Sequence, residues 1–192
     1  MEANWLTIIE FTFHEEGGEI LSLDPADPGN WTSGVQGLGT LAGSRFGVSA
    51  PVLMQQKHLA EADVPAAMAS LTKQDAEAIY RQEYWLLVQG PRLPGGLDLS
   101  VFDAAANMGV EASARLLQHT LVHMGHANLT VDGLLGSETL GACQMEETPR
   151  LIAELSIAQL DAYLVLAKWP RYGRGWSGRV GRRLSASQAL AS

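Results

Sequence analysis

The stretch WLTIIEFTFHEEGG, residues 5–18, sets the character of the chain. Its apolar side chains recur three and four residues apart, which predicts a helix with one buried face. The pair Gly17-Gly18 comes directly after this pattern, and glycine just past the last periodic residue is a common helix end. Glu15 and Glu16 are therefore expected in or beside the last turn of the first helix.

A second kind of sequence follows this helix. Residues 19–50 are rich in Gly, Pro, Asp, Ser and Thr and have little periodicity. Within them, residues 24–30 read DPADPGN, and two Asp-Pro steps set turns and disfavour a helix. The sequence therefore predicts an irregular or weakly β lobe between helices.

The rest of the chain shows helical patterns separated by breakers. The Pro-Gly-rich segment 91–96 is the best internal boundary and predicts two lobes, 1–92 and 93–192. The fold class is mainly α, because strands and helices do not alternate. The expected helices are 51–62, a helix opened by a Thr72/Asp75 capping box and running to Val88, 97–108, 110–124, a helix from Thr148 to about Lys168 stopped by Pro170, and 176–190.

Composition and charge limit the classes of protein. The chain has 192 residues, 46% of them hydrophobic and 18% charged, which favours a packed globule over a disordered chain or a coiled coil. The net charge of −8 disfavours nucleic-acid binding. It is unevenly spread, because residues 162–192 hold six bases and no acid. These bases could meet an anionic polymer or pair with the acidic body.

Metal and thiol chemistry have weak support. Cys143 is the only cysteine, so no intramolecular disulfide forms, and we expect it to act as a small hydrophobic residue. His119, His123 and His126 share the spacing of one helical face, but no His-Glu-x-x-His motif or cysteine partner accompanies them. Asp132-Gly133 is expected to form a tight turn. We expect no metal and no cofactor.

No targeting or membrane-spanning pattern is visible. The first residues lack a basic segment, acidic residues interrupt the apolar pattern, and no run of about 18 apolar residues occurs. We therefore expect synthesis in the cytoplasm without a signal peptide, and no transmembrane segment.

Glu16 is the candidate general acid. A carboxyl at the C-terminal end of a helix meets the negative end of the helix dipole, which favours the neutral form that a general acid needs. Asp24, Asp27 and Thr32 follow within sixteen residues and could face this acid across a cleft. Glycoside hydrolysis uses such a set, although two acids before a Gly-Gly pair more often form a solvated helix end.

Short motifs extend this pattern along the chain. They are EEGG at 15–18, DPADPGNWTSG at 24–34, GSRFGVSA at 43–50, FDAAANMG at 102–109, VDGLLGSETL at 131–140 and GRGW at 173–176. In this order, from about residue 5 to about 183, they resemble the glycoside hydrolase family 108 lysozymes. These are N-acetylmuramidases of phage endolysins, gene transfer agents and secretion-associated peptidoglycan hydrolases. The motifs after residue 110 are similar to the peptidoglycan-binding region that accompanies those enzymes.

The resemblance implies a lysozyme-like helical domain, and it makes Glu16 the catalytic acid with Asp27 and Thr32 as candidates for the second role. Trp31, in the loop beside the acid, is the best candidate for glycan contact, and Asp24 and Ser33 in the same loop are further candidates for binding the substrate. Asn107 is either a buried amide or a residue of the cleft. Asn30 and Ser33 depart from the residues that relatives often carry, which affects loop geometry more than the acid.

The expected activity is hydrolysis of the β-1,4 bonds of peptidoglycan. The expected partners are glycan strands and a holin-type pore through which a monomeric enzyme would reach the cell wall after release. Retention or inversion of configuration depends on the separation of two carboxyl groups and stays open. The alternative is a binding or secretion accessory module that kept the scaffold without turnover.

Overall fold

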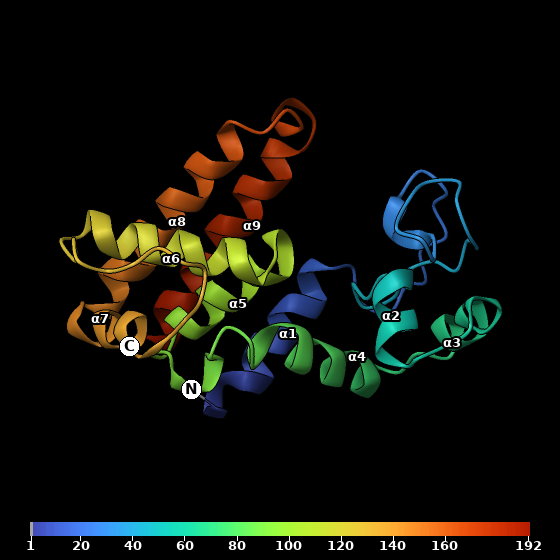
Figure 1. The fold of residues 1–192 in the computed structure, drawn as a ribbon, viewed down its shortest axis with the longest axis horizontal. Coiled ribbons are helices and arrows are strands. Elements are labelled where there is room, and N and C mark those ends of the chain that lie inside the picture. The colour runs from blue at the N-terminus through green and yellow to red at the C-terminus, as the bar shows by residue number, and fades with distance from the viewer. Residues whose placement is uncertain (1) are drawn as a thin grey trace. The chain divides into compact units, whose positions relative to one another are not determined.

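The computed structural model describes residues 2–192 and is mainly helical, which confirms the expected fold class. In the described chain the irregular lobe after the first helix has only isolated β-bridges. The elements are η1 (Glu2–Asn4), α1 (Trp5–Glu15), η2 (Pro28–Asn30), α2 (Ala50–Gln56), η3 (Glu61–Asp63), α3 (Val64–Ala69), α4 (Lys73–Tyr80), η4 (Arg81–Trp85), η5 (Gly90–Arg92), α5 (Leu97–Met108), α6 (Val110–His123), α7 (Ser137–Met145), α8 (Thr148–Leu164) and α9 (Trp169–Leu190) (Figure 1).

The chain divides into two compact units. Ile9–Arg81 forms the first, here called the loop unit, and the segment up to Ile8 joins Gln82–Ser192 in the second, the bundle unit. The packing boundary lies before residue 92 because the Trp85 ring is buried in the bundle unit, with its centroid 5.3 Å from that of Trp5. A functional division at residue 92 stays a prediction.

The end of α1 follows the sequence. Gly17 and Gly18 have positive φ angles of 81° and 67°, and the Gly18 amide donates to the Phe13 carbonyl at 2.9 Å. Glycine adopts this left-handed conformation without the steric cost that a side chain brings. Glu16 is therefore presented at the point where the chain leaves the helix.

Asn30 holds the irregular lobe together from inside. Its side chain is fully buried, and its Nδ2 donates to the Asp24 carbonyl at 2.9 Å. Its own carbonyl accepts from the amides of Ala42 and Gly43, each at 2.9 Å. Asn30 thus joins residues 24 and 42–43 of a lobe that has no sheet, through its side-chain amide and its backbone carbonyl.

The middle helices are shorter than expected. The capping box at Thr72 and Asp75 is confirmed, but α4 ends at Tyr80 and continues as the π-helical turn η4. α2 ends at Gln56, because His58 takes a positive φ of 50° and the Leu59 amide donates to the Met54 carbonyl at 3.0 Å. These two features form a Schellman-type helix end without glycine.

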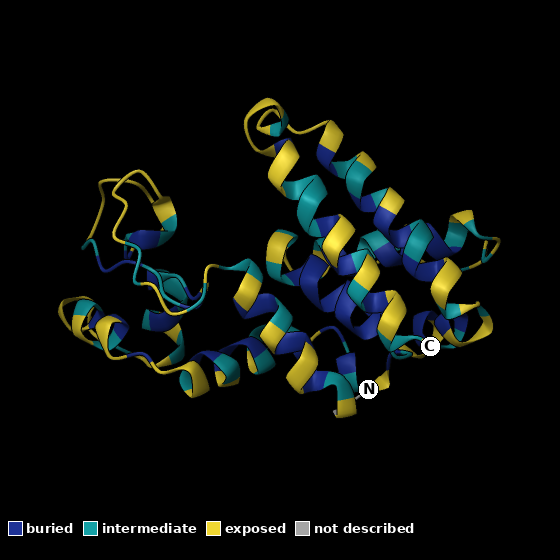
Figure 2. Cartoon of the chain, turned by 180° about the vertical axis from the view of Figure 1, so that it is seen from behind, coloured by how far each residue is buried: buried dark blue, intermediate teal, exposed yellow. Residues whose placement is uncertain are grey.

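α5 is the centre of the bundle unit. Every residue of it from Leu97 to Ala105 is buried, and α6, α8 and α9 pack around it (Figure 2). The expected helix to Lys168 was too long, since α8 ends at Leu164. Pro170 lies in the first turn of α9 instead of stopping α8, because proline is tolerated where its missing N–H has no partner anyway. Between residues 2 and 192, none of the helices combines the length and the apolar character needed to cross a membrane.

Candidate functional site

Glu16 is half-buried directly after the last residue of α1. Gly47, from the irregular lobe, lies against it: a Cβ built on Gly47 would be 2.8 Å from Glu16 Cγ and would also overlap the Tyr80 hydroxyl. Gly47 has a positive φ of 75°, which independently favours glycine. The end of α1, the irregular lobe and α4 therefore meet at Glu16.

Aromatic rings back this corner. The Tyr80 ring packs edge-on against Phe13 at 5.9 Å between centroids, and Phe13 lies 5.6 Å from Phe46. All three side chains are buried. Such rings hold the backbone on either side of Glu16 in place and exclude water from one flank of it.

A small cavity lies next to these rings. It has a volume of about 250 Å³ and is lined by Glu10, Phe13, His14, Gly18, Glu19, Phe46 and Lys73. Lys73 Nζ forms an ion pair with Glu10 Oε1 at 2.5 Å and lies 5.6 Å from the centre of the Phe13 ring. α1 and the start of α4 are tied together at this point.

The two loop aspartates shape turns. Asp27 is exposed and its Oδ1 accepts from the Gly29 amide at 2.9 Å, which caps η2. Asp24 Oδ1 accepts from the Ala26 amide, also at 2.9 Å. The Trp31 indole donates to the Pro25 carbonyl at 3.0 Å and is half-buried on the same loop. Asp24, Asp27 and Trp31 thus lie on one exposed loop whose shape their own side chains maintain.

Thr32 has a partner that the sequence analysis missed. Its hydroxyl donates to Glu61 Oε1 at 2.9 Å, and the Thr40 hydroxyl donates to the same oxygen at 3.0 Å. The hydrogen bonds from Thr32 and then Thr40 lower the pKa of Glu61 below its ordinary value. No spacing or motif links position 61 to position 32, so only the folded chain reveals this acid.

Glu61 and Thr32 line a cavity of about 380 Å³ together with Ser33, Leu38, Gly39 and Met54. Ser33 donates from its hydroxyl to the Leu38 carbonyl at 2.7 Å, which closes the loop around the cavity. Gly39 is required there, because a Cβ on it would lie 2.5 Å from Thr32 Oγ1. The structure therefore brings Thr32 and Ser33 together with Glu61, and Glu16 is not among the residues that line this cavity.

Asn107 belongs to the bundle unit. It is exposed near the end of α5, and its Nδ2 donates to the Asp103 carbonyl at 2.7 Å. The buried alternative for this amide is thereby excluded, and a role in glycan binding stays a prediction.

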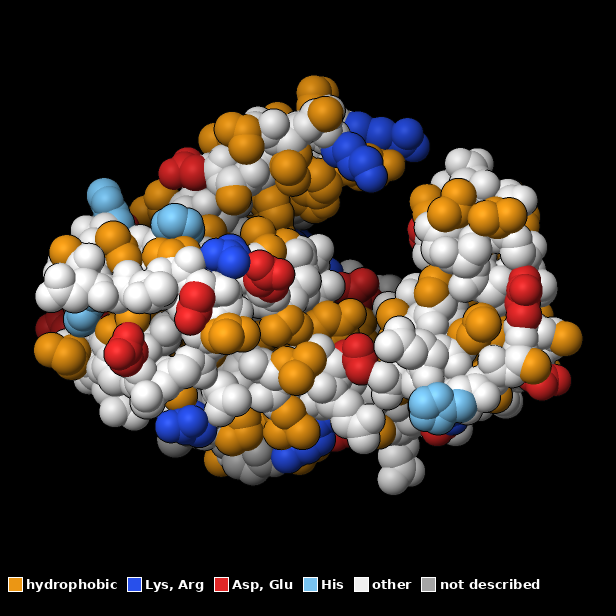
Figure 3. Space-filling model, viewed as in Figure 1, with side chains coloured by type: hydrophobic (Ala, Val, Ile, Leu, Met, Phe, Trp, Pro, Cys, Tyr) orange, Lys and Arg blue, Asp and Glu red, His pale blue; other side chains and the backbone are white. Residues whose placement is uncertain are grey.

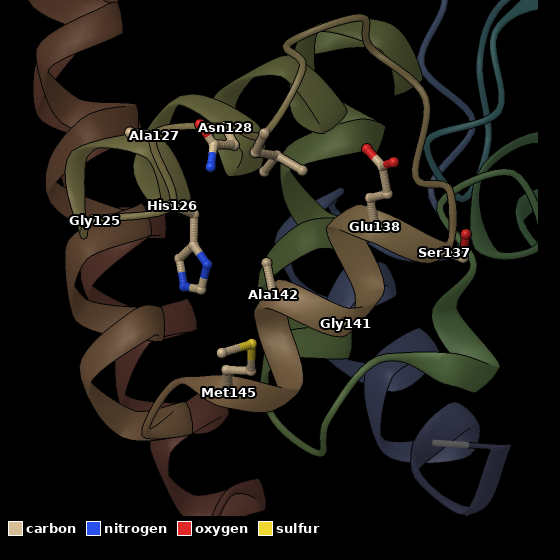
Figure 4. A pocket seen from close by; sticks show the side chains of 10 residues that line it. Gly125, His126, Ala127, Asn128, Ser137, Glu138, Gly141, Ala142 and Met145 are labelled. Atoms are coloured by element: carbon tan, nitrogen blue, oxygen red, sulfur yellow. The ribbon is translucent and has the colours of Figure 1, made fainter.

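A cavity of the bundle unit lies between the end of α6 and α7 (Figure 4). Its volume is about 550 Å³, and Gly125, His126, Asn128, Ser137, Glu138 and Met145 are among the residues that line it. His126 Nε2 lies 2.8 Å from Glu146 Oε1, whereas His119 and His123 line a separate cavity beside α8. Across residues 2–192, no three His, Cys, Asp or Glu side chains are grouped so that they could hold a metal ion.

Cys143 is fully buried in α7, and burial raises the pKa of its thiol to about 12. A thiol in this state is a poor nucleophile. The Asp132-Gly133 turn is present as expected, since Gly133 has a φ of 83° and Asp132 Oδ1 accepts from the Leu134 amide at 2.9 Å.

Two of the six C-terminal bases pair with the body. The Arg183 side chain is fully buried and donates to Gln159 Oε1 and, at 2.9 Å, to Ser156 Oγ. Arg179 donates to Asp103. The C-terminal bases could either contact an anionic polymer or pair with the rest of the protein, and these two arginines do the second.

Comparisons with known proteins identify a family and a similar solved structure. The model of the Glycosyl hydrolase 108 family matches residues 9–109, which is 101 of the 192 residues. The solved structure of Brucella abortus SagA is similar with a TM-score of 0.79 and 27% identity, over 100% of this chain and 97% of that one. No curated protein sequence matches the chain. The family match includes Glu16 and the irregular lobe and ends directly after α5. Because the match covers more than half of the chain, the chain belongs to the Glycosyl hydrolase 108 family.

Proposed function

We propose that this protein is a lysozyme-like peptidoglycan hydrolase that cleaves the β-1,4 bond after N-acetylmuramic acid, with Glu16 as the general acid. Membership of the Glycosyl hydrolase 108 family indicates a glycoside hydrolase. The observation that carries the choice of Glu16 is its placement. Glu16 packs against Gly47, where the Tyr80 hydroxyl also lies, so the end of α1, the irregular lobe and α4 meet beside it.

In the proposed reaction, the Glu16 carboxyl gives its proton to the glycosidic oxygen as the bond between that oxygen and the anomeric carbon breaks. The sugar passes through an oxocarbenium-like state. A water molecule, or the Asp27 carboxylate followed by water, then adds to the anomeric carbon. The proton that the water loses returns to the Glu16 carboxylate, directly or through solvent, so that each turnover consumes one water and restores the enzyme.

Thr32 and Glu61 supply the second part of the proposal. The Thr32 hydroxyl donates to Glu61 Oε1 and accepts from the Thr40 amide at 2.9 Å, and Thr32 and Glu61 line the same cavity. A carboxylate that is kept ionised by two hydroxyl donors can hold a water molecule or stabilise positive charge on the sugar. We therefore assign Glu61 as the residue that positions Thr32.

Glu16→Gln tests the proposal, and Glu15→Gln, at the neighbouring position, is the matched control. Purified cell walls are incubated with each protein, and released muropeptides and new reducing ends are measured. Glu16→Gln is expected to fold normally and to lose at least a hundredfold in release, because proton transfer by a positioned acid contributes roughly 10²–10⁴ in rate. Glu15→Gln is expected to retain activity.

Full activity of Glu16→Gln would overturn the assignment of the acid. If the parent protein pelleted with cell walls in a saturable way and released nothing, the non-catalytic binding module would be the correct function. If release occurred without new reducing ends, either an amide bond would have been cleaved or an anhydro sugar would have formed, and in both cases the protein would not be a hydrolytic muramidase.

A further inference from the structure

The connection between α8 and α9 presents an unusual amount of apolar surface. The two helices pack along each other, and the chain reverses at their far end (Figure 1). Leu164, Val165 and Leu166 lie in this reversal and are 53%, 84% and 44% exposed. We call residues 164–174 the hairpin tip. Consecutive exposed apolar residues of this size mark a contact surface more often than an ordinary stretch of solvated chain.

Positive charge surrounds these apolar side chains. Lys168, Arg171 and Arg174 are exposed at the hairpin tip, unlike Arg179 and Arg183, which pair with the body. No acidic residue occurs from residue 162 to the end of the given sequence. In the space-filling view, blue and orange side chains lie together at this end of the helical pair (Figure 3). The tip is therefore cationic and apolar at once, on a protein whose net charge is −8.

A group of aromatic rings forms the base of the hairpin tip. Trp176 stacks on Tyr172 at 5.8 Å and lies 5.1 Å from Tyr163 and 6.4 Å from Trp169. Gly173 permits this arrangement, because a Cβ on it would lie 2.6 Å from the Trp169 ring. Trp169 and Trp176 are half-buried and Tyr172 is 42% exposed, so these rings reach the surface beside the cations.

We propose that the hairpin tip docks on the surface of an anionic lipid bilayer, with Leu164, Val165 and Leu166 among the acyl chains. Lys168, Arg171 and Arg174 then meet the lipid phosphates, and the Trp and Tyr rings lie at the level of the headgroups, which is the depth that these side chains favour. Contact of this kind is peripheral and needs no spanning helix. It is independent of glycan hydrolysis and does not rest on the proposed function.

The chemistry of the tip favours lipid over the other anionic partners. Nucleic acid or a wall polymer would satisfy the three cations but leave the exposed apolar side chains at 164–166 in water. An uncharged glycan strand would stack on the aromatic rings but offers no anion to the three cations. Only a surface that is both anionic and apolar uses all three features.

Flotation with vesicles tests the proposal on the full chain. One set contains phosphatidylglycerol and phosphatidylethanolamine, the other phosphatidylcholine alone. We expect binding to the first set only, a blue shift of tryptophan fluorescence on binding, and weakening as salt rises, because salt screens surface charges. Lys168→Gln/Arg171→Gln/Arg174→Gln should lose on the order of 100-fold in affinity, from about fivefold for each cation.

Two matched controls separate the tip from general surface effects. Leu164→Ser/Val165→Ser/Leu166→Ser should abolish the blue shift, whereas Leu134→Ser/Met145→Ser, which alters exposed apolar residues elsewhere in the bundle unit, should not. Arg92→Gln/Arg150→Gln removes exposed bases away from the tip and should bind as the parent does. Glu16→Gln should also bind vesicles normally, so failure of the proposed hydrolysis leaves this test intact.

Several outcomes would overturn the proposal. Equal binding to both vesicle sets, no binding to either, or unchanged binding by both tip variants would each do so. A further contrary result is binding of the parent to purified cell walls or DNA but not to vesicles, with weaker binding by the tip variants. That result would show that the tip recognises a hydrated polymer and not a bilayer.

Discussion

Arg179 donates two hydrogen bonds to one oxygen of Asp103: Nε lies 3.0 Å and Nη2 2.8 Å from Oδ1. Asp103 is 1% exposed, in the middle of α5, and Arg179 reaches it from α9. A carboxylate in this position needs its cation, because the surrounding core offers it no water. The basic C-terminal helix is thus attached to the acidic centre of the bundle unit by a buried ion pair.

Removing one partner of this pair should destabilise the bundle unit strongly. Arg179→Met leaves the Asp103 charge buried without its partner, and such losses cost about 3–5 kcal/mol. Urea unfolding followed by circular dichroism measures the change. Arg150→Met, at an exposed position of α8, is the control and should cost less than about 0.5 kcal/mol. The double variant Asp103→Leu/Arg179→Met should recover most of the loss, and no difference between Arg179→Met and the control would show that the pair is not structural.

Glu61 should affect turnover more than stability. Glu61→Gln keeps the shape of the side chain but replaces the charged acceptor of Thr32 and Thr40 with a neutral one, which weakens both hydrogen bonds. We expect roughly a tenfold fall in kcat with KM nearly unchanged. The measurement is the initial rate of reducing-end formation over a range of cell-wall concentrations.

Asp63→Asn lies in the same turn, η3, and serves as the control for Glu61→Gln. It should keep parental kinetics. Two results would contradict a positioning role for Glu61. One is a melting temperature of Glu61→Gln so low that unfolding explains the whole loss of rate, and the other is a change in KM without a change in kcat.

A comparison of alanine substitutions at Gly47 and Gly37 distinguishes the effect of backbone strain from the effect of steric overlap. Both have positive φ angles, 75° and 79°, but a Cβ on Gly37 has no atom within 4 Å, whereas one on Gly47 would overlap Glu16 and Tyr80. Gly37→Ala should cost about 1–2 kcal/mol from the left-handed backbone and leave activity in place. Gly47→Ala should lose more stability and most of its activity. Thermal unfolding and cell-wall hydrolysis together check this, and equal effects at both positions would exclude a crowded Glu16 corner.

Asp75 should make the loop unit sensitive to acid. The hydrogen bond from Lys57, 2.6 Å away, and then that from Thr72 lower the pKa of Asp75 from 3.8 to about 2. Because the folded-state pKa is the lower one, the stabilisation is fully present above about pH 4 and is lost as pH falls toward 2. The difference in melting temperature between the parent and Asp75→Asn should therefore shrink over this range. A difference that is constant from pH 7 to pH 2 would contradict this.

Local sequence predicted the helix ends that depend on local chemistry. Gly17-Gly18 ends α1, Gly109 separates α5 from α6, and Thr72 with Asp75 caps α4, each as expected. The errors occurred where a competing backbone preference was stronger: His58 ended α2 in a left-handed conformation, and Pro170 opened α9 instead of stopping α8. A periodic pattern reports which residues are apolar, and it does not report where a helix end is satisfied by tertiary contacts.

The candidate site could be predicted only in part for a similar reason. Glu16 is recognisable because its neighbours in sequence, Gly17 and Gly18, place it at a helix end. Glu61 is 29 residues from Thr32, and nothing near it in sequence marks it. The role of Asp27 in capping η2 became visible only with the Gly29 amide in place.

The sequence by itself determined the mainly helical fold, the irregular lobe and the position of Glu16, because each of these follows from interactions between residues a few positions apart. The tertiary structure alone decided which C-terminal bases are buried and which remain at the hairpin tip. It also decided that the Thr32 and Thr40 hydroxyls donate hydrogen bonds to the same carboxylate oxygen of Glu61. Burial and pairing depend on which distant segments the packed core brings together, and a charge has the same appearance in the sequence whether it ends in water or against a carboxylate.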